Sequence, residues 1–375
     1  MKSKTALVSG ITGQDGSYLA ELLLEKEYQV IGLHRRSSTN NFERIMGIMG
    51  HPRFHLHEFD LCDSSSVYNS IDHYKPDEFY NLAAQSHVAT SFNQPSFTFS
   101  VNTQGVVNIL EAIKNYSPNT KLYQAGTSEM FGRNYTKDKN GVKYQDEATQ
   151  FLPQSPYGVS KLASHRMLQI YREAYGIFAS NGILFNHESP RRGSYFVTQK
   201  IVLWIKDFFQ WCRKNNITPV EVKSDDENLV FKDLSYPKLR LGNLNAKRDW
   251  GHAKDYTEMQ WRILQQKKPN DYIIATGKAY SVRQFINIAS KYLKMKIFWR
   301  GRGLKEEGYI KNNGKNETII KIDKNYFRPN EVNYLKGDSK KAFKDLNFKP
   351  KYSFNDLVKD MLNEDMIKAK KELTK

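Results

Sequence analysis

Apolar and amphipathic stretches alternate along the first half of the chain. Short apolar runs typical of buried strands occupy residues 4–10, 28–34, 53–59, 78–84, 121–126 and 179–186. Apolar side chains recur at helical spacing in residues 17–27, 101–116 and 157–176. Strands that alternate with helices in this way predict an α/β fold, with a Rossmann-type doubly wound parallel sheet.

The pattern becomes less regular after residue 186. Helical spacing returns at 197–214, 251–266 and 354–371. Strand-like runs occur at 238–243 and 271–277. The polar stretch around 214–237 shows little periodicity and reads as an insertion or a long loop. We therefore predict a Rossmann domain over residues 1–186 and a smaller, mixed C-terminal domain over residues 187–375, partly interleaved with the first.

Composition narrows the class of protein. No apolar run reaches the length that a membrane span needs, so no membrane partner is expected. The two cysteines, Cys62 and Cys212, lie far apart, which argues against a disulfide framework or a cysteine metal site and fits a cytoplasmic protein. The net charge of +17 comes from scattered lysines without a nucleic-acid-binding motif. This favours a solvated basic surface and small anionic ligands; no specific nucleic acid and no metal are expected.

A glycine-rich turn follows the first predicted strand and opens the first predicted helix. Its spacing, G-x-x-G-x-x-G, lets the backbone approach a pyrophosphate, and the helix N-terminus supplies N–H donors and a positive partial charge. The alternative is a tight turn that binds nothing, but the position at the first strand–helix junction favours a dinucleotide. The predicted contacts are Gly10, Thr12, Gly13, Gln14, Asp15 and Gly16.

The end of the second strand indicates which dinucleotide is bound. NAD sites usually place an acidic residue there, whereas this chain has two arginines and two serines, Arg35, Arg36, Ser37 and Ser38. Guanidinium and hydroxyl groups suit a 2′-phosphate, so NADP is preferred to NAD. Further contacts are predicted for the adenine and along the sheet edge, at Asp60, Leu61, Leu82, Ala83, Ala84, Gln85 and Ser86.

Tyr157 and Lys161 lie four residues apart on one face of a helix that Ser155 caps. A phenol ordinarily titrates near pH ~10, and a neighbouring ammonium group stabilises its phenolate. The pair can therefore remove a hydroxyl proton while a hydride leaves the same carbon. Both residues are predicted to contact the cofactor as well.

The combination of G-x-x-G-x-x-G and Y-x-x-x-K resembles the extended short-chain dehydrogenase/reductase family. Within it, several stretches resemble the GDP-mannose 4,6-dehydratases: GITGQDGSYLAELLLEK, RRSS, NLAAQSHV, TSE, SPYGVSK, NGILFNHESPRRG, LGNLNAKRDWGHAKDY and IATG. The similarity extends from about residue 6 to the C-terminal helix. It implies an NADP-dependent hydro-lyase that acts on GDP-mannose in nucleotide-sugar metabolism, such as GDP-fucose biosynthesis, and that forms a homo-oligomer.

The resemblance also assigns roles to individual residues. It implies that Thr127 contacts the C4 hydroxyl of the sugar and that Glu129 has the acid/base role that elimination across C5–C6 requires. It also implies a cofactor-side position for His187 and Arg192. Substrate contacts are implied for Ser86, Thr127, Asn186, Arg248 and Arg328, the two arginines holding the diphosphate. For the function of the protein, the alternatives are another sugar-nucleotide dehydratase or a 4-epimerase of the same fold, or a non-catalytic NADP-sensing protein. For the two arginines, the alternative is a role in surface ion pairs.

Overall fold

The computed structural model describes residues 3–214, 220–221, 229–230, 236–292, 295–312 and 315–362. The chain forms two compact units. The first comprises Met1–His187, Asp249–Lys278 and Tyr334–Lys351, and the second comprises Glu188–Arg248, Ala279–Asn333 and Tyr352–Lys375. The chain therefore passes between the units several times, and each unit is described by itself below.

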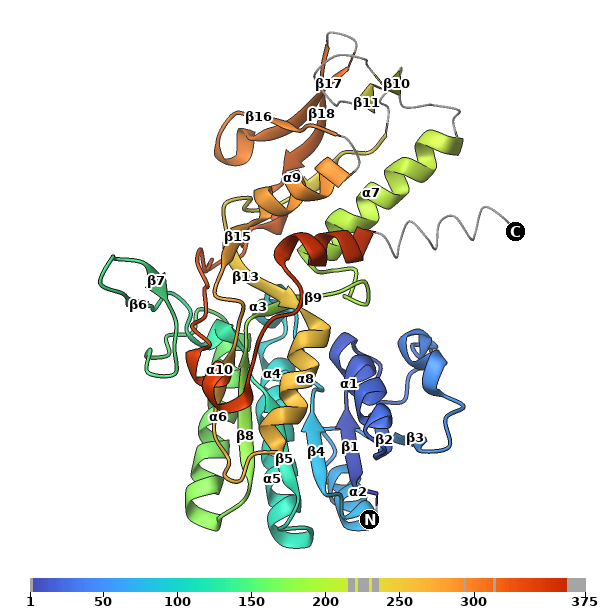
Figure 1. The fold of residues 1–375 in the computed structure, drawn as a ribbon, viewed down its shortest axis with the longest axis vertical. Helices are drawn as coiled ribbons and strands as arrows, with labels where there is room; N and C mark the ends of the chain where they lie inside the picture. The colour runs from blue at the N-terminus through green and yellow to red at the C-terminus, as the bar shows by residue number, and fades with distance from the viewer. Residues whose placement is uncertain are drawn as a thin grey trace. The chain divides into compact units, whose positions relative to one another are not determined.

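A seven-stranded parallel sheet forms the centre of the first unit (Figure 1). Its strands follow the order β3-β2-β1-β4-β5-β8-β14. They are β1 (Thr5–Ser9), β2 (Gln29–His34), β3 (Phe54–Glu58), β4 (Glu78–Asn81), β5 (Lys121–Ala125), β8 (Ala179–Leu184) and β14 (Tyr272–Ile274). The order reverses direction between β1 and β4, which confirms the predicted doubly wound sheet. Such folds bind ligands outside the carboxyl ends of the strands at this reversal.

Helices cover both faces of this sheet, as the strands' apolar sequences require. One face packs against α1 (Gln14–Glu25), α8 (Ala253–Leu264) and α10 (Lys340–Leu346). The other packs against α2 (Ser64–Tyr74), α5 (Gly105–Tyr116) and α6 (Pro156–Tyr175). Successive β1 residues serve opposite faces, because Ala6 and Val8 belong to the first core and Leu7 to the second.

The predicted helix at 101–116 has an irregular start. A π-helical turn over Ser100–Gln104 precedes α5 and follows two short helices, α3 (Val88–Asn93) and α4 (Pro95–Phe99). Wide turns of this kind often occur at functional sites. The remaining short elements of this unit are a hairpin of β6 (Thr136–Lys137) and β7 (Lys143–Tyr144), and 3₁₀ turns at Glu43–Ile48 and Ser128–Met130.

The second unit combines two helices with a mixed sheet of order β12-β18-β17-β16. The helices are α7 (Val197–Lys214) and α9 (Val282–Tyr292), and the strands are β12 (Leu239–Leu241), β16 (Phe298–Arg300), β17 (Glu307–Asn312) and β18 (Lys315–Ile322). Further described elements of this unit are two 3₁₀ turns, Gly303–Lys305 and Lys324–Tyr326, and an antiparallel pair of β10 (Val220–Glu221) with β11 (Leu229–Val230). Three further strands, β9 (Asn186–Glu188), β13 (Lys247–His252) and β15 (Ala279–Ser281), occur where the chain passes between units.

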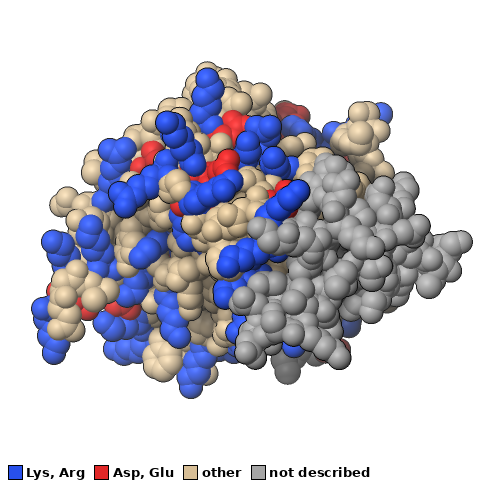
Figure 2. All heavy atoms as spheres, turned by 90° about the horizontal axis from the view of Figure 1, so that it is seen from above, with Lys and Arg blue, Asp and Glu red and all other residues tan. Residues whose placement is uncertain are grey.

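Two predicted elements fall partly outside the described residues. Most of the predicted insertion at 214–237 does, and the predicted C-terminal helix is described, and helical, only for residues 354–362. In the described part of the chain, no helix combines the length and apolar character needed to cross a membrane. Lys and Arg side chains are spread over the face drawn in Figure 2 and outnumber the acidic ones there, as expected for a solvated basic surface.

Candidate active site

The glycine-rich turn lies at the sheet reversal, tightly packed against the end of β4. Gly10 adopts a left-handed backbone with φ +70°, and a Cβ atom there would lie 2.8 Å from the Ala83 nitrogen. A Cβ on Gly16 would lie 2.3 Å from the Gly10 carbonyl oxygen, while Gly13 caps α1. The turn therefore needs glycine for its shape and presents bare backbone at a helix N-terminus, which fits a dinucleotide pyrophosphate.

A polar network fixes the strand ends around this turn. The Ser9 hydroxyl donates to Asn81 Oδ1 over 2.6 Å and accepts hydrogen bonds from the Leu82 and Ala83 backbone nitrogens, both at 3.2 Å. The Asn81 amide in turn donates to Gln124 Oε1 at 2.7 Å. The network links β1, β4 and β5 and fixes the start of the predicted cofactor segment 82–86. Sequence reasoning did not identify it.

Tyr157 and Lys161 lie in the first turns of α6, as predicted. Ser155 caps this helix by accepting a hydrogen bond from the Gly158 nitrogen at 3.0 Å. Lys161 is buried and donates from Nζ to the Ala125 carbonyl oxygen at 2.9 Å, at the carboxyl end of β5. Burial lowers the pKa of Lys161 from 10.5 to about 8. Within the described part of the chain, no carboxylate forms an ion pair with this ammonium group, so its positive charge is not neutralised.

The segment with Thr127 and Glu129 directly follows β5 and is buried. The Thr127 hydroxyl accepts a hydrogen bond from the Glu129 nitrogen at 3.2 Å, which starts a 3₁₀ turn. A Cβ on Gly158 would lie 2.9 Å from the Glu129 carbonyl oxygen, so the start of α6 presses against this turn. The structure therefore brings together the two segments that carry the four predicted catalytic residues, Thr127, Glu129, Tyr157 and Lys161.

Asn102 connects the cofactor segment to α6 and was not predicted. Its side chain accepts from the Gln85 nitrogen at 2.9 Å and donates to the Gln85 oxygen at 3.0 Å, imitating a strand partner. The same amide nitrogen lies 3.1 Å from the Ser160 hydroxyl, beside Lys161. The π-helical turn that holds Asn102 thus fixes the spacing between the two predicted binding segments.

Asp15 and His187 contact each other. The carboxylate lies 2.8 Å from His187 Nε2 and also accepts a hydrogen bond from Gln260 Nε2 at 2.9 Å. Gln260 comes from α8 and is fully buried. The two residues that the sequence predicted as cofactor contacts are therefore paired with one another, next to the glycine-rich turn.

The other predicted cofactor residues of this unit differ in exposure. The segment Arg35–Ser38 is exposed directly after β2, and Ser86 is exposed beyond β4. Leu61 is buried, and Asp60 accepts a hydrogen bond from the Cys62 nitrogen at 2.9 Å. Arg35–Ser38 therefore lies accessible at the place where the two dinucleotides are distinguished.

The predicted arginines lie in the second unit. Arg192 lies 3.0 Å from the Glu188 carboxylate and stacks over the Phe196 ring. Arg248 is buried and pairs with Glu331 at 3.2 Å. Since Arg328 lies three residues before Glu331, the chain brings the segments of the two proposed diphosphate arginines close together. The ion pair with Glu331 offsets part of the cost of burying the Arg248 guanidinium.

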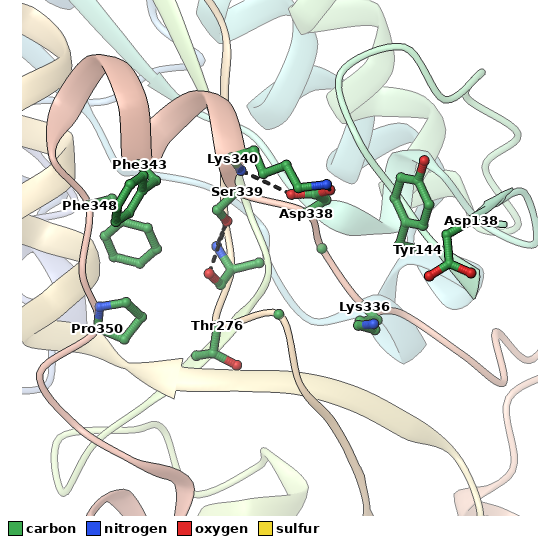
Figure 3. A pocket seen from close by; sticks show the side chains of 13 residues that line it. Asp138, Tyr144, Thr276, Lys336, Asp338, Ser339, Lys340, Phe343, Phe348 and Pro350 are labelled. Carbon is green, nitrogen blue, oxygen red and sulfur yellow. Dashed lines mark hydrogen bonds and ion pairs between the residues drawn. The ribbon is translucent and has the colours of Figure 1, made fainter. Parts of the chain in front are cut away.

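A separate pocket of about 430 Å³ lies within the first unit, and none of the predicted catalytic residues lines it (Figure 3). Thr276, Lys336 and Tyr144 are among its lining residues. Asp249 holds two of the lining residues in place by accepting hydrogen bonds from the Thr276 and Gly277 backbone nitrogens at 2.8 and 2.9 Å. Burial raises the pKa of Asp249 to about 6.

The sheet order, the glycine-rich turn and the Tyr157–Lys161 helix define an enzyme of the extended short-chain dehydrogenase/reductase class. A family model described as GDP-mannose 4,6 dehydratase matches residues 7–210 and 231–361. The chain belongs to this family, which confirms the resemblance seen in the sequence.

Relatives from distant organisms are similar over nearly the whole chain. The GDP-mannose 4,6 dehydratase of Drosophila melanogaster is 43% identical, covering 97% of this chain and 87% of the relative. GDP-mannose 4,6 dehydratase 1 of Arabidopsis thaliana is 45% identical, covering 98% and 91%. A solved dTDP-glucose 4,6-dehydratase from Streptomyces venezuelae, with NAD and TYD bound, shares the fold with a TM-score of 0.74 at 19% identity and 96% coverage of both chains.

Proposed function

We propose that the protein converts GDP-mannose to GDP-4-dehydro-6-deoxy-mannose and water. The observation that carries this proposal is the burial of Glu129 against the start of the helix that holds Tyr157 and Lys161. Beside a nicotinamide that accepts the hydride, a tyrosine and a lysine suffice to oxidise a sugar alcohol, whereas elimination of water also needs a group that first accepts and then donates a proton. Family membership supports the same reaction.

A bound nicotinamide dinucleotide would accept a hydride from the sugar and return it later. The glycine-rich turn, Asp60 with Leu61, and the segment 82–86 would hold this group, with Tyr157 and Lys161 at its reactive end. Glycines that admit no Cβ at positions 10 and 16 are the feature that fits it. We infer that the dinucleotide is NADP, because Arg35 and Arg36 follow β2 without an acidic residue.

The residues of the chain then divide the proton transfers. Thr127 orients the C4 hydroxyl, and Tyr157 removes its proton as C4 is oxidised, aided by the Lys161 ammonium. The new C4 carbonyl acidifies the C5 proton, which Glu129 removes and passes to the departing C6 hydroxyl, releasing water. After a hydride reaches C6, Tyr157 returns its proton to C5. Substrate and product therefore differ by one water, with no net oxidation.

The Glu129→Gln variant tests the assigned role. It keeps the size and polarity of the side chain but cannot accept the C5 proton. We expect it to bind GDP-mannose and NADP yet to form no dehydrated product, whereas Glu173→Gln, on the exposed side of α6, should retain full turnover. The assay is mass spectrometry of the nucleotide sugar. Normal turnover by Glu129→Gln contradicts the assigned role, and a product of unchanged mass from the wild type indicates an epimerase.

The cofactor and the assembly state can be measured on the same preparation. Denaturation should release NADP or NADPH rather than NAD, as identified by mass. We also infer a homo-oligomer, since Phe97, Phe99 and Val159 are exposed on α4 and α6, two helices in contact. Sedimentation at micromolar concentration should give a mass of two or four chains, and a monomer contradicts the inference.

A further inference from the structure

Asp15 places a carboxylate in the first turn of α1, directly after the glycine-rich turn. An acidic side chain there favours the helix itself but opposes a second anion at the same N-terminus. If this turn binds the dinucleotide phosphates, as proposed above, the charge of Asp15 must be balanced for the phosphates to bind well. The contacts of Asp15 show how this happens.

Side-chain nitrogen atoms face the Asp15 carboxylate. His187 Nε2 lies 2.8 Å and Gln260 Nε2 2.9 Å from Asp15 Oδ2, and Gln14 Nε2 lies 3.1 Å from Oδ1. The Gln14 amide also donates to the His187 carbonyl oxygen at 3.2 Å. The Asp15 and His187 side chains are only 16% and 13% exposed, so water screens their interaction weakly.

The hydrogen bonds of His187 indicate a positively charged ring. Nδ1 lies 2.8 Å from the Phe185 carbonyl oxygen, and Nε2 faces the Asp15 carboxylate. Both partners can only accept, and only the doubly protonated imidazolium donates from both nitrogens. The ring also stacks on Tyr256 of α8, with centroids 4.6 Å apart. The titratable side chains of Asp15 and Tyr256 face the ring. Tyr123 of β5 lies near Asp15, and its pKa is raised by burial and by that carboxylate.

We propose that His187 is the counter-ion of Asp15 and that this ion pair sets the affinity of the glycine-rich turn for dinucleotide phosphates. His187 is then a positioning residue, which acts through Asp15 and needs no contact with the cofactor. The proposal rests on the proposed function only in taking this turn as the phosphate site. Loss of the imidazolium removes a positive charge and leaves the Asp15 carboxylate beside the phosphates, whereas loss of both charges does not.

A double-mutant cycle separates this role from direct contact. NADPH binding to the cofactor-free full-length protein is measured by calorimetry for wild type, His187→Gln, Asp15→Asn and the double variant. We expect His187→Gln to weaken binding about tenfold, equivalent to about 1.4 kcal/mol, and the double variant to bind within about threefold of wild type. Asp15→Asn alone should bind as tightly as wild type or tighter. Asp72→Asn, on the exposed surface of α2, controls for net charge.

The change in NADPH affinity when Asp15→Asn is added to His187→Gln decides the outcome. If Asp15→Asn fails to restore NADPH binding in the His187→Gln background, or if His187→Gln binds normally, the ion-pair proposal is wrong. Should His187→Gln not fold, the wild type and the double variant still test it. The double variant must then bind NADPH within about threefold of wild type, and a larger loss contradicts the ion-pair proposal. Absence of NADPH or NADH binding in the wild type would instead contradict the proposed cofactor site.

Discussion

Replacement of Lys161 by methionine should stabilise the protein while it removes activity. The ammonium group is buried, and burial lowers its pKa from 10.5 to about 8. A shift of this size means that the charged form destabilises the folded state by roughly 3 kcal/mol at neutral pH. Methionine fills a similar volume without charge, but it leaves the Ala125 carbonyl oxygen without its donor, which costs about 1 kcal/mol. The expected net gain is about 2 kcal/mol.

The pH dependence of this gain identifies its cause. Between pH 8 and 10.5 the unfolded chain holds the lysine proton more often than the folded protein does, so the stability of the wild type rises with pH in that window. The advantage of Lys161→Met should therefore shrink by about 1.3 kcal/mol from pH ~7 to pH ~9. The loss of turnover should be at least about a hundredfold, because Tyr157 loses the charge that supports its phenolate.

Urea unfolding of the cofactor-free protein at the two pH values measures the effect. Lys268→Met, at an exposed lysine, controls for the general change in charge and hydrophobicity. An advantage for Lys161→Met that stays constant with pH, or a variant less stable than wild type at pH ~7, would refute the argument that desolvation of this ammonium destabilises the fold.

Two further substitutions test the parts that support the site. Gly10→Ala combines a left-handed backbone with a Cβ 2.8 Å from the Ala83 nitrogen, so the melting temperature and the retained cofactor should both fall, whereas Gly47→Ala, with open space around it, should change neither. Glu78→Ala should lower the free energy of unfolding by about 3 kcal/mol, since buried Glu78 accepts hydrogen bonds from Lys4, Tyr28, Tyr80 and Gln265. Urea unfolding measures the Glu78 effect, and an unchanged midpoint contradicts it.

The central sheet could be predicted because its strands and helices have clear periods. The predicted helix at 157–176 corresponds to α6, and the predicted strand at 121–126 to β5. Of the second unit, α7 was predicted, but the hairpin of β17 and β18 was missed because its alternation is weak and its lysine content high. Strand pairing there depends on distant partners such as β12.

The part of the site that could be predicted consists of residues that lie a few positions apart in the sequence. Tyr157 and Lys161 share a helix face, and Thr127 and Glu129 share one turn, so short motifs locate them. Asn102 and Gln260 have no such signal. Each acts on a partner far along the chain, Asn102 on Gln85 and Ser160, and Gln260 on Asp15. Only the folded structure shows these contacts, since a single sequence contains no information on which distant polar groups meet.

The interleaved course of the chain has a consequence for biosynthesis. Strand β14 and helices α8 and α10 belong to the first unit but are encoded after residue 248. When only residues 1–187 have left the ribosome, β8 is an open sheet edge, and one face of the sheet lacks Tyr256, Met259 and Ile263. A nascent chain of that length exposes apolar surface and an unpaired strand together, a combination that invites aggregation. The first unit therefore matures only after most of the polypeptide has been synthesised.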